Sequence, residues 1–506
     1  MSRVAVATTS QLAADAAAEV AGMGGNAVDC AIAAAMLSIN TEPGVCALAG
    51  GGYITVWPAD ADPVTVDGNV AVPGLGTAAE PLQVETVRMD YGGGIETLTG
   101  PGSVAVPGTL AALELASQRY GRVGWREVLG PTVRAARSGF PLSAACHYYL
   151  GYSGKPVFGR SRDGYGALHD ERGRLHDARS TIVVPHLADS LAAIAEEGSR
   201  IFYQGEIGAH LSEHVQSGGG HLSAEDLRRY RAIVRPALGT VLGDWRIASN
   251  PPPAVGGAVL CAMLIACNRR PVTSWDEESV EHLIRVQQGA LSIRKSKLDL
   301  ADDVAAEVSQ MLTLADAGNL AARSQSSSTV HTSAVDDAGL ACAITASSGY
   351  GSGEMPENTG LWLNNCLGEL ELNRRGLDAG PAGARLPSNM APGAARNGGA
   401  VLAMGSPGAD RITTALLQFL INFVQLGLEL DDAVAHPRLH LEMDQATATV
   451  AVEPGLPLPD IDLPVTRYAE IGMYFGGVGA ALLKANGDFQ VAADPRREGG
   501  TCIAGG

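Results

Sequence analysis

The spacing of apolar residues changes along the chain. In the first part, apolar positions recur at helical spacing, and the predicted helices cover residues 11–22, 26–40, 125–138, 187–198, 207–217 and 254–267. After residue 328, short extended segments alternate with turn signals. The predicted strands there cover residues 329–335, 339–347, 361–363 and 400–404, and one further helix covers residues 411–426. Helices that precede strands, with no repeating strand–helix–strand unit, predict a layered α+β fold rather than a doubly wound sheet.

A further strand is predicted at residues 53–57, directly after Gly50, Gly51 and Gly52. Glycines at this place let the backbone approach another backbone segment, or a ligand, without an intervening side chain. A phosphate-binding loop is the alternative interpretation. It is disfavoured because no Lys-Ser or Lys-Thr pair follows and no GxGxxG motif is present.

Thr329 lies where a stretch without clear periodicity, residues 305–328, passes into a predicted strand. Three serines that end in Ser328 precede it. If the bond between Ser328 and Thr329 broke, Thr329 would carry a free amine beside its own hydroxyl, the arrangement of a self-activating nucleophile. On the local sequence alone, a Ser/Thr-rich linker that enters a strand is the preferred interpretation.

Two histidines are the remaining candidates for site chemistry. His210 and His214 lie four residues apart in the predicted helix 207–217, a spacing that can ligate a metal ion. The intervening residues do not match a zinc-protease helix and no third ligand is near, so a solvated helix face is preferred and no metal is expected. The eight cysteines form no CxxC pair, which predicts reduced, mostly buried thiols.

Composition and charge narrow the class of protein. The 506 residues are 46% hydrophobic and 18% charged, which predicts a folded chain of two to four domains or one large interwoven unit. The net charge of −18 argues against nucleic acid or an anionic membrane as a partner. The N-terminus lacks the pattern of a signal peptide, and the longest apolar run is too short to span a membrane. A cytoplasmic enzyme is expected.

Several segments, taken together and in this order, resemble the γ-glutamyltranspeptidase family of N-terminal-nucleophile hydrolases. They are GGNAVDCAIAA at 24–34, EPG…AGGGY at 42–53, VPGTLAALELASQRYG at 106–121, GGHLSAEDLRRYRA at 219–232, PPP…GG at 251–257, HTSAVDDAGLACAIT at 331–345, TGLWLNN at 359–365 and GSPGADRITTALLQ at 405–418. The resemblance covers nearly the whole chain. It implies a four-layer αββα core that cuts itself into a large subunit, residues 1–328, and a small subunit, residues 329–506.

The resemblance also implies the catalytic residues. Thr329 falls on the new N-terminus and nucleophile of the small subunit. Ser347 falls where the family usually has a second threonine that hydrogen-bonds the nucleophile. Gly408 and Ala409 fall on the Gly-Gly pair whose backbone N–H groups form the oxyanion hole. No cofactor is implied.

The substrate-binding positions depart from the family pattern. Asn69 stands where the family has the arginine that binds the α-carboxylate of a γ-glutamyl group. Cys366 and Glu369 replace the Gln and Asp that hold the substrate's amino group, and Ser388-Asn389 replaces a Ser-Ser pair. An Asn expected shortly after Ser347 is absent, since that segment is two residues shorter. These changes imply a hydrolase of altered specificity for a small molecule.

Three functions stay open at this point. The first is a divergent hydrolase that cleaves an amide or a C–C bond beside a carbonyl, as the resemblance to family members of actinobacterial antibiotic pathways that make 4-alkylproline units implies. The second is a conventional γ-glutamyl hydrolase or transpeptidase, in which Arg374, Arg375 or Arg385 replaces the lost arginine. The third is an unprocessed binding or scaffold protein. The two fragments would form a heterodimer, and a dimer of heterodimers is left open.

Overall fold

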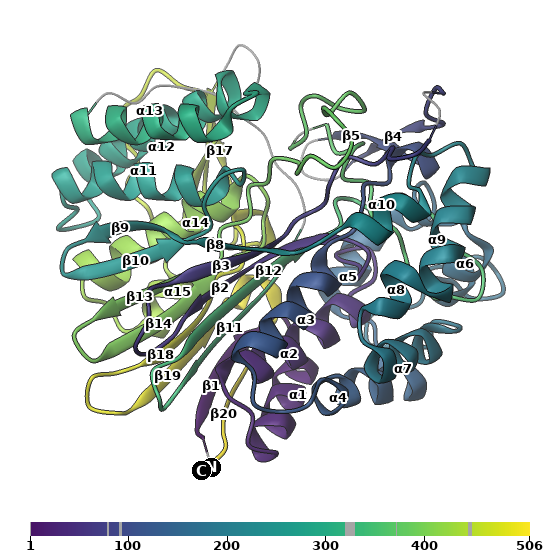
Figure 1. Cartoon of the computed structure of the whole chain (residues 1–506). Coiled ribbons are helices and arrows are strands. Elements are labelled where there is room, and N and C mark those ends of the chain that lie inside the picture. The colour runs from purple at the N-terminus through teal and green to yellow at the C-terminus, as the bar shows by residue number, and fades with distance from the viewer. Residues whose placement is uncertain (1, 78–79, 91–93, 319–328, 371, 444–447) are drawn as a thin grey trace.

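The computed structural model describes residues 2–77, 80–90, 94–318, 329–370, 372–443 and 448–506. Two β-sheets lie face to face, and helices cover the outer face of each sheet (Figure 1). The architecture is therefore the four-layer αββα arrangement that the sequence predicts. Both termini lie together at one end of the molecule, where β1 and β20 are neighbours (Figure 1).

The two central sheets are antiparallel throughout the described residues. The first sheet has the order β20-β1-β11-β12-β2-β3-β8. Its strands are β1 Val4–Thr8, β2 Gly51–Trp57, β3 Val64–Gly68, β8 Ile233–Pro236, β11 Val330–Asp336, β12 Ala341–Ser347 and β20 Gly500–Ala504. The second sheet has the order β19-β18-β14-β13-β10-β9. Its strands are β9 Leu238–Leu242, β10 Trp245–Ser249, β13 Gly393–Asn397, β14 Ala400–Gly405, β18 Gly479–Leu483 and β19 Phe489–Ala493.

The helices divide between the two sheets. The layer on the first sheet and its extension comprise α1 Gln11–Gly22, α2 Ala27–Thr41, α3 Thr109–Tyr120, α4 Trp125–Ser138, α5 Ala144–Ser153, α6 Arg162–Leu168, α7 Leu187–Glu197, α8 Arg200–Gln204, α9 Glu206–Ser217 and α10 Ala224–Arg229. The layer on the second sheet comprises α11 Gly256–Arg269, α12 Glu277–Ser296, α13 Val304–Ala317, α14 Arg411–Leu420 and α15 Leu430–Ala435. The smaller sheets are β4 Glu85–Met89 with β5 Ile95–Thr99, β6 Phe140–Pro141 with β7 Thr181–Ile182, and β15 Leu439–Met443 with β16 Ala448–Val452 and β17 Val465–Arg467.

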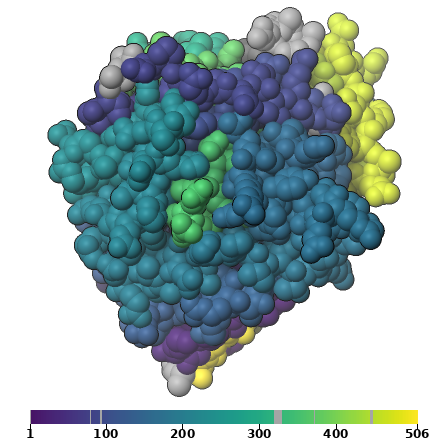
Figure 2. Space-filling view, turned by 90° about the vertical axis from the view of Figure 1, so that its right-hand side faces the viewer, coloured from purple at the N-terminus to yellow at the C-terminus, as the bar shows by residue number. Residues whose placement is uncertain are grey.

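Segments from both sides of residue 328 are interwoven. Each central sheet combines strands that precede and strands that follow this position. On the face shown in Figure 2, a green segment from the second half of the chain is surrounded by blue and teal segments of the first half. Glu354, which follows β12, accepts hydrogen bonds from Arg160 at 2.9 Å and from His214 of α9 at 2.8 Å. The two halves therefore share one core and are not separate domains.

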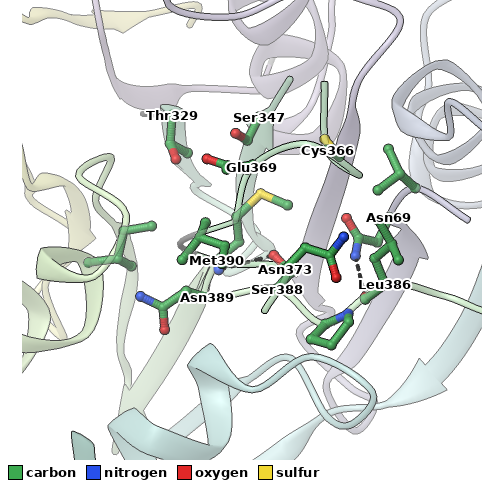
Figure 3. A pocket seen from close by; sticks show the side chains of 14 residues that line it. Asn69, Thr329, Ser347, Cys366, Glu369, Asn373, Leu386, Ser388, Asn389 and Met390 are labelled. Carbon is green, nitrogen blue, oxygen red and sulfur yellow. Dashed lines mark hydrogen bonds between the residues drawn. The ribbon is translucent and has the colours of Figure 1, made fainter. Parts of the chain in front are cut away.

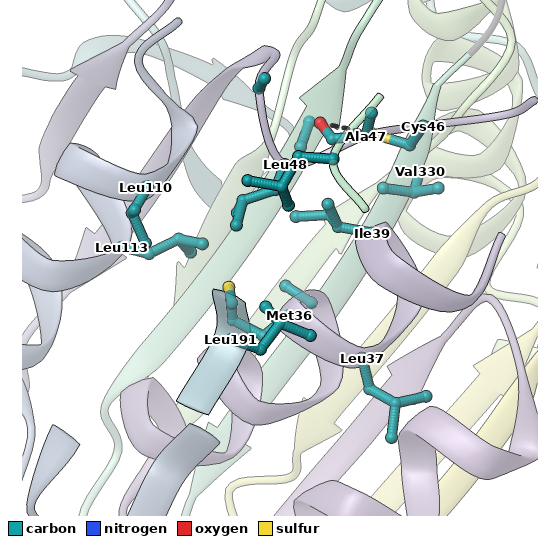
Figure 4. Close-up of a cluster of buried hydrophobic side chains, with 14 of the residues drawn as sticks. Met36, Leu37, Ile39, Cys46, Ala47, Leu48, Leu110, Leu113, Leu191 and Val330 are labelled. Atoms are coloured by element: carbon teal, nitrogen blue, oxygen red, sulfur yellow. Dashed lines mark hydrogen bonds between the residues drawn. The ribbon is translucent and has the colours of Figure 1, made fainter. Parts of the chain in front are cut away.

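Strand β11 is buried on both faces, and its side chains alternate between two cores. Val330 and Ala334 belong to the core beneath the helices, where Val330 lies with Ile39 and Cys46 (Figure 4). Val335 belongs to the thin, largely alanine core between the two sheets. Because the side-chain period of a strand is two, Thr329 lies on the same side as Val335, toward the space between the sheets.

Four details differ from the sequence-based expectations. Residues 361–363 form no strand, because only Leu363 pairs, in a single bridge to Ala49. The segment expected to lose periodicity after residue 305 instead begins with the helix α13. The helix expected at 411–426 ends as α14 at Leu420 and continues as a π-helical turn. The strand β1, next to the edge of its sheet, was not predicted, since its five residues, four of them apolar, form a short run without alternation.

Other expectations are confirmed. The predicted buried helix at 254–267 is α11. Asn26 caps α2 in a capping box with Asp29, as the Gly-Gly-Asn sequence indicates. All eight cysteines are free, and six of them are buried. Among the described helices, none combines the length and the apolar character needed to cross a bilayer.

Asp336 anchors the hairpin between β11 and β12 to the start of α2. Its buried carboxylate accepts hydrogen bonds from the backbone N–H groups of Ala27 at 3.2 Å, Ala338 at 3.0 Å and Leu340 at 3.0 Å. The adjacent Asp337 is exposed and accepts from Ser2 and Arg3 at the N-terminus. Asp336 thus ties the end of the strand that carries Thr329 to the helix behind it.

We predict that Asp336→Ala lowers the free energy of unfolding by about 3 kcal/mol, because it leaves buried backbone donors without an acceptor. Asp337→Ala, which removes only exposed contacts, should cost less than about 1 kcal/mol. Urea unfolding of the two variants beside the wild-type protein measures the difference. Equal losses would show that the buried carboxylate does not hold this hairpin.

Candidate active site

Thr329 lies at the open end of the β11–β12 pair. Val330 pairs with Ala346, and Ser347 is the last residue of β12. Extending this register by one residue sets Thr329 opposite Ser347, so the two hydroxyl side chains are neighbours across the strands. Thr329 is 2% exposed and Ser347 8% exposed. The strand pairing itself therefore brings the predicted nucleophile to the predicted second hydroxyl.

A pocket surrounds this pair (Figure 3). It is a cavity of about 30 Å³, enough for one or two water molecules. Its walls come from the end of β3, the loop after β12, the loop before β13 and the first turn of α14. The lining residues are Asn69, Val70, Thr329, Ser347, Cys366, Glu369, Leu372, Asn373, Leu386, Pro387, Ser388, Asn389, Met390 and Ile412.

The structure brings together seven of the residues predicted for the site, since Asn69, Cys366, Glu369, Ser388 and Asn389 line the pocket with Thr329 and Ser347. Ser328, the other residue of the predicted cleavage site, lies outside the described residues. Gly408 and Ala409 do not line the pocket, but their loop adjoins it. The sequence comparison with a known family thus located a set of side chains that are far apart in the chain.

The glycines before β2 permit the close packing beneath the site. A Cβ atom on Gly50 would lie 2.3 Å from the carbonyl oxygen of Ser347, and one on Gly51 would lie 2.5 Å from Oδ1 of Asn69. Neither position tolerates a side chain without moving the backbone. The glycines therefore serve the close approach of two backbone segments.

Asn364 holds the loop that carries Cys366 and Glu369. Its Nδ2 donates to the carbonyl oxygens of Ala49 at 2.8 Å and Ala105 at 2.9 Å. Its Oδ1 accepts from the backbone N–H groups of Ala105 at 3.1 Å and Cys366 at 3.0 Å. Segments near residues 50, 105 and 365 are therefore joined by one buried amide. This explains how three motifs that are distant in sequence meet at the pocket.

Asn69 forms hydrogen bonds to neighbouring segments of the protein through both its side chain and its backbone carbonyl. Its Nδ2 donates to the carbonyl oxygen of Leu386 at 2.8 Å, and its own carbonyl accepts from the hydroxyl of Tyr230. Ser347 accepts from the backbone N–H of Gly349 at 3.2 Å. Glu369 is 4% exposed, and its Oε2 lies 3.2 Å from the position that a Cβ atom on Gly349 would occupy. The Glu369 carboxylate therefore lies close to the turn that follows Ser347.

The loop of Gly408 and Ala409 has the backbone geometry of a strained turn. Gly408 has φ 124° and Ala409 has φ 51°, a left-handed conformation that is uncommon for a residue with a side chain. The carbonyl of Ala409 accepts from Nδ2 of Asn389 and from the backbone N–H of Ile412. Within the described residues, neither the Gly408 N–H nor the Ala409 N–H donates a hydrogen bond. The described fold therefore does not use either N–H group in a hydrogen bond.

Buried ion pairs hold this loop from below. Asp410 forms an ion pair with Arg294, and Nζ of Lys295 lies 3.5 Å from its Oδ2. Burial alone would raise the pKa of Asp410, but the two cations lower it, so the carboxylate stays ionised. Arg294 also contacts Asp299 at 3.1 Å. The charges of Arg294 and Lys295 are thus used in the scaffold of the loop.

His331, two residues after Thr329, is a structural link between the two sheets. Its Nε2 lies 2.7 Å from the hydroxyl of Ser333, which donates to the carbonyl of Gly479 in the second sheet. Its Nδ1 lies 2.8 Å from the hydroxyl of Thr345. Burial lowers the pKa of His331 to about 3, so the ring is neutral and both nitrogens are engaged. His331 is not placed to act as a base for Thr329.

The three arginines that were alternatives for binding a carboxylate do not line the pocket. Arg374 donates to the carbonyl of Lys295 at 2.7 Å, and Arg375 donates to that of Leu300 at 2.7 Å. Arg385 lies 3.4 Å from the buried carboxylate of Asp67 and stacks on Tyr230. No arginine or lysine is among the lining residues that the structure describes.

The two histidines of α9 were both expected on a solvated helix face, but their environments differ from each other. His214 is hydrogen-bonded to Glu354 at 2.8 Å and is only partly exposed, whereas His210 is exposed. Among the described residues, no group of three or more His, Cys, Asp or Glu side chains is arranged to hold a metal ion. His214 therefore packs α9 against the segment after β12.

Asn373 is the polar lining residue that the sequence did not predict; the other lining residues not predicted are apolar. It lies four residues after Glu369, and its Nδ2 donates to the carbonyls of Leu367 at 3.0 Å and Gly376 at 2.8 Å. The Asn-x-x-Gly turn from 373 to 376 was a local signal for an ordered loop. It does not say which way the amide oxygen points, so the residue could not be assigned to the pocket.

Comparisons with known proteins identify the family of the chain. A family model described as Gamma-glutamyltranspeptidase matches residues 13–504. The chain belongs to this family. The glutathione hydrolase proenzyme of Pseudomonas sp. strain A14 is 28% identical over 472 residues, which are 86% of this chain and 81% of that protein. The match supports the order of motifs found in the sequence.

Two solved structures share the fold over nearly the full length. The cephalosporin acylase of Bacillus halodurans has a TM-score of 0.82 and 22% identity, over 99% of this chain and 96% of that chain. LmbA2991HD has a TM-score of 0.74 and 20% identity, over 100% of this chain and 99% of that chain. The likeness confirms the four-layer fold expected of an N-terminal-nucleophile hydrolase in this family.

We predict that His331 makes the protein less stable in acid. At pH 5 the unfolded chain protonates this ring, whose ordinary pKa is 6.5, while the folded protein does not, so about 2 kcal/mol of stability is lost between pH 7 and pH 5. His331→Gln, which keeps an acceptor and a donor, should remove this part of the pH dependence. Thermal unfolding at both pH values measures it, with His210→Gln as the exposed control. An unchanged pH dependence in His331→Gln would contradict the assignment.

Proposed function

We propose that this protein is a self-processing threonine hydrolase of the γ-glutamyltranspeptidase family whose substrate is not a γ-glutamyl compound. The observation that carries the proposal is the pocket around Thr329, in which the two hydroxyl groups lie together and no arginine or lysine is among the described lining residues to bind an α-carboxylate. Cleavage between Ser328 and Thr329 would create the fragments 1–328 and 329–506, held together as a heterodimer. The interwoven sheets support this, because each fragment alone would lack strands of both sheets.

In the proposed reaction, the free α-amine of Thr329 takes the proton from its Oγ, which attacks a carbonyl carbon of the substrate. The available N–H groups of Gly408 and Ala409 hold the oxyanion. The bond to the leaving group breaks, the leaving group takes up the proton, and an ester on Thr329 remains. Water then hydrolyses the ester, which gives an acid and restores the hydroxyl. Ser347 orients the nucleophile from the opposite strand.

The chemistry does not require an amide. The same attack can expel carbon, provided that the departing carbanion is stabilised as an enolate or enamine. The resemblance to family members of 4-alkylproline biosynthesis favours such a C–C cleavage in an antibiotic pathway, and the altered substrate-binding residues support a substrate other than glutathione. Amide cleavage is the alternative within the same mechanism.

A conventional γ-glutamyl activity is less well supported. Asn69 stands where the carboxylate-binding arginine is expected, and it donates to Leu386. Arg374, Arg375 and Arg385 are each bonded to backbone carbonyls away from the pocket. A charged, bidentate contact to the carboxylate is therefore missing, and contacts of that kind contribute roughly 2–5 kcal/mol.

We predict that the purified protein consists of fragments 1–328 and 329–506, and that Thr329→Ala stays as one chain because it has no nucleophile. Thr329→Ser, which keeps the hydroxyl, should still be cut. Intact-mass analysis distinguishes these cases directly. A wild-type protein that remains a single chain would refute the nucleophile assignment and favour a binding or scaffold protein.

We further predict that the processed protein cleaves a γ-glutamyl anilide with a kcat/KM about 30-fold or more below that of family members with the arginine, because the carboxylate contact is absent. Release of the aniline, followed by absorbance, measures this. The two-fragment pattern in the same sample is the control for processing. Cleavage at the rate of a glutathione hydrolase would contradict the altered specificity.

A further inference from the structure

Two buried amide oxygens in the pocket have no hydrogen-bond partner within the described residues: Oδ1 of Asn373 and Oδ1 of Asn389. The side chains are 3% and 1% exposed, respectively. Neither amide is part of the proposed bond-breaking step. A buried carbonyl oxygen without a hydrogen bond is unfavourable, so we expect a bound ligand to donate hydrogen bonds to these two oxygens.

The hydrogen bonds that the side-chain nitrogens donate determine the orientation of both amides. Nδ2 of Asn373 donates to two backbone carbonyls, those of Leu367 at 3.0 Å and Gly376 at 2.8 Å. Nδ2 of Asn389 donates to the carbonyl of Ala409. Turning either amide over would set its oxygen against a carbonyl oxygen, which is repulsive. In both residues the oxygen is therefore the atom left for a ligand.

The charged side chains around the pocket favour the same kind of ligand as the two amide oxygens do. Glu369 lines the pocket with these two residues, and no arginine or lysine does so among the described lining residues. Two buried cations beneath the neighbouring loop, Arg294 and Lys295, are paired with Asp410. A carboxylate in this pocket would meet the two amide oxygens and the carboxyl group of Glu369, and no arginine or lysine among the described lining residues would offset its charge.

We infer that the pocket selects ligands that donate hydrogen bonds. The acyl part of the substrate is then a neutral or cationic group with at least two donors, such as an ammonium, amide N–H or hydroxyl. It carries no carboxylate. This inference rests on the proposed function only in that Thr329 marks the place of the reacting carbonyl. Asn373 and Asn389 are specificity residues in this assignment. The donor-reading wall is thus defined as Glu369, Asn373 and Asn389.

The test compares three small amides that share a terminal carboxamide for the Thr329 end. Glutamine carries an ammonium and a carboxylate at the other end, glutaminamide carries an ammonium and a second carboxamide, and 4-aminobutanamide carries the ammonium alone. Binding to the wild-type protein is measured by isothermal titration calorimetry. Glutaminamide should bind at least about tenfold more tightly than glutamine, with 4-aminobutanamide between them.

The variant Asn389→Ser removes one of the acceptors and should bring the affinity for glutaminamide to within about threefold of that for 4-aminobutanamide. Asn397→Ser, in the exposed end of β13, is the matched control and should leave all three affinities unchanged. Equal or tighter binding of glutamine, no binding of any of the three, or an unchanged preference in Asn389→Ser would each overturn the inference.

The outcome is separable from that of the proposed function. If the chain is cut at Thr329 but glutamine binds as well as glutaminamide, the donor-reading wall is wrong and the nucleophile stands. If the chain remains uncut but the preference for glutaminamide is found, the wall stands and the threonine mechanism fails.

Discussion

The structure depends on the antiparallel pairing of β11 with β12 between two cores. One face of β11 packs Val330 and Ala334 against the helices, and the other face carries Val335 into the layer between the sheets. The period of two then sets Thr329, His331 and Ser333 on the side toward the second sheet. A slip of one residue would send these polar side chains into the helix-facing core. The position of the proposed nucleophile follows from this pairing.

The polar side chains between the sheets are satisfied among themselves. His331 connects Thr345 to Ser333, and Ser333 connects to Gly479 of the second sheet. Because burial keeps the ring neutral, this link adds no charge to the thin alanine layer beside it. The first sheet is thereby held against the second directly behind the strand end that carries Thr329. Rigidity at this place fits the proposed role of Thr329, because a nucleophile must meet its carbonyl carbon in one geometry.

Positive charge near the site is used for scaffolding. Arg294 and Lys295 pair with Asp410 beneath the Gly408–Ala409 loop, and Arg385 lies against Asp67 beside the strand that leads to Asn69. These pairs hold the Gly408–Ala409 loop and the walls in place, and no arginine or lysine is among the pocket-lining residues that the structure describes. Under the proposed function, Asn69 stands where a carboxylate-binding arginine is expected, and none of the described lining residues supplies a positive charge in its place.

The sequence by itself determined the larger part of the fold and most of the site. Helical periodicity located α1, α2, α4, α7 and α9, and the motifs that resemble the family named seven of the residues that line the pocket. Short segments were assigned wrongly: β1 was missed, and residues 361–363 were predicted as a strand but form none, because pairing with distant strands decides their state. Only the tertiary structure decided which polar atoms remain unpaired. The residue type of Asn373 is visible in the sequence, but the direction of its amide depends on carbonyls that the folded loop supplies.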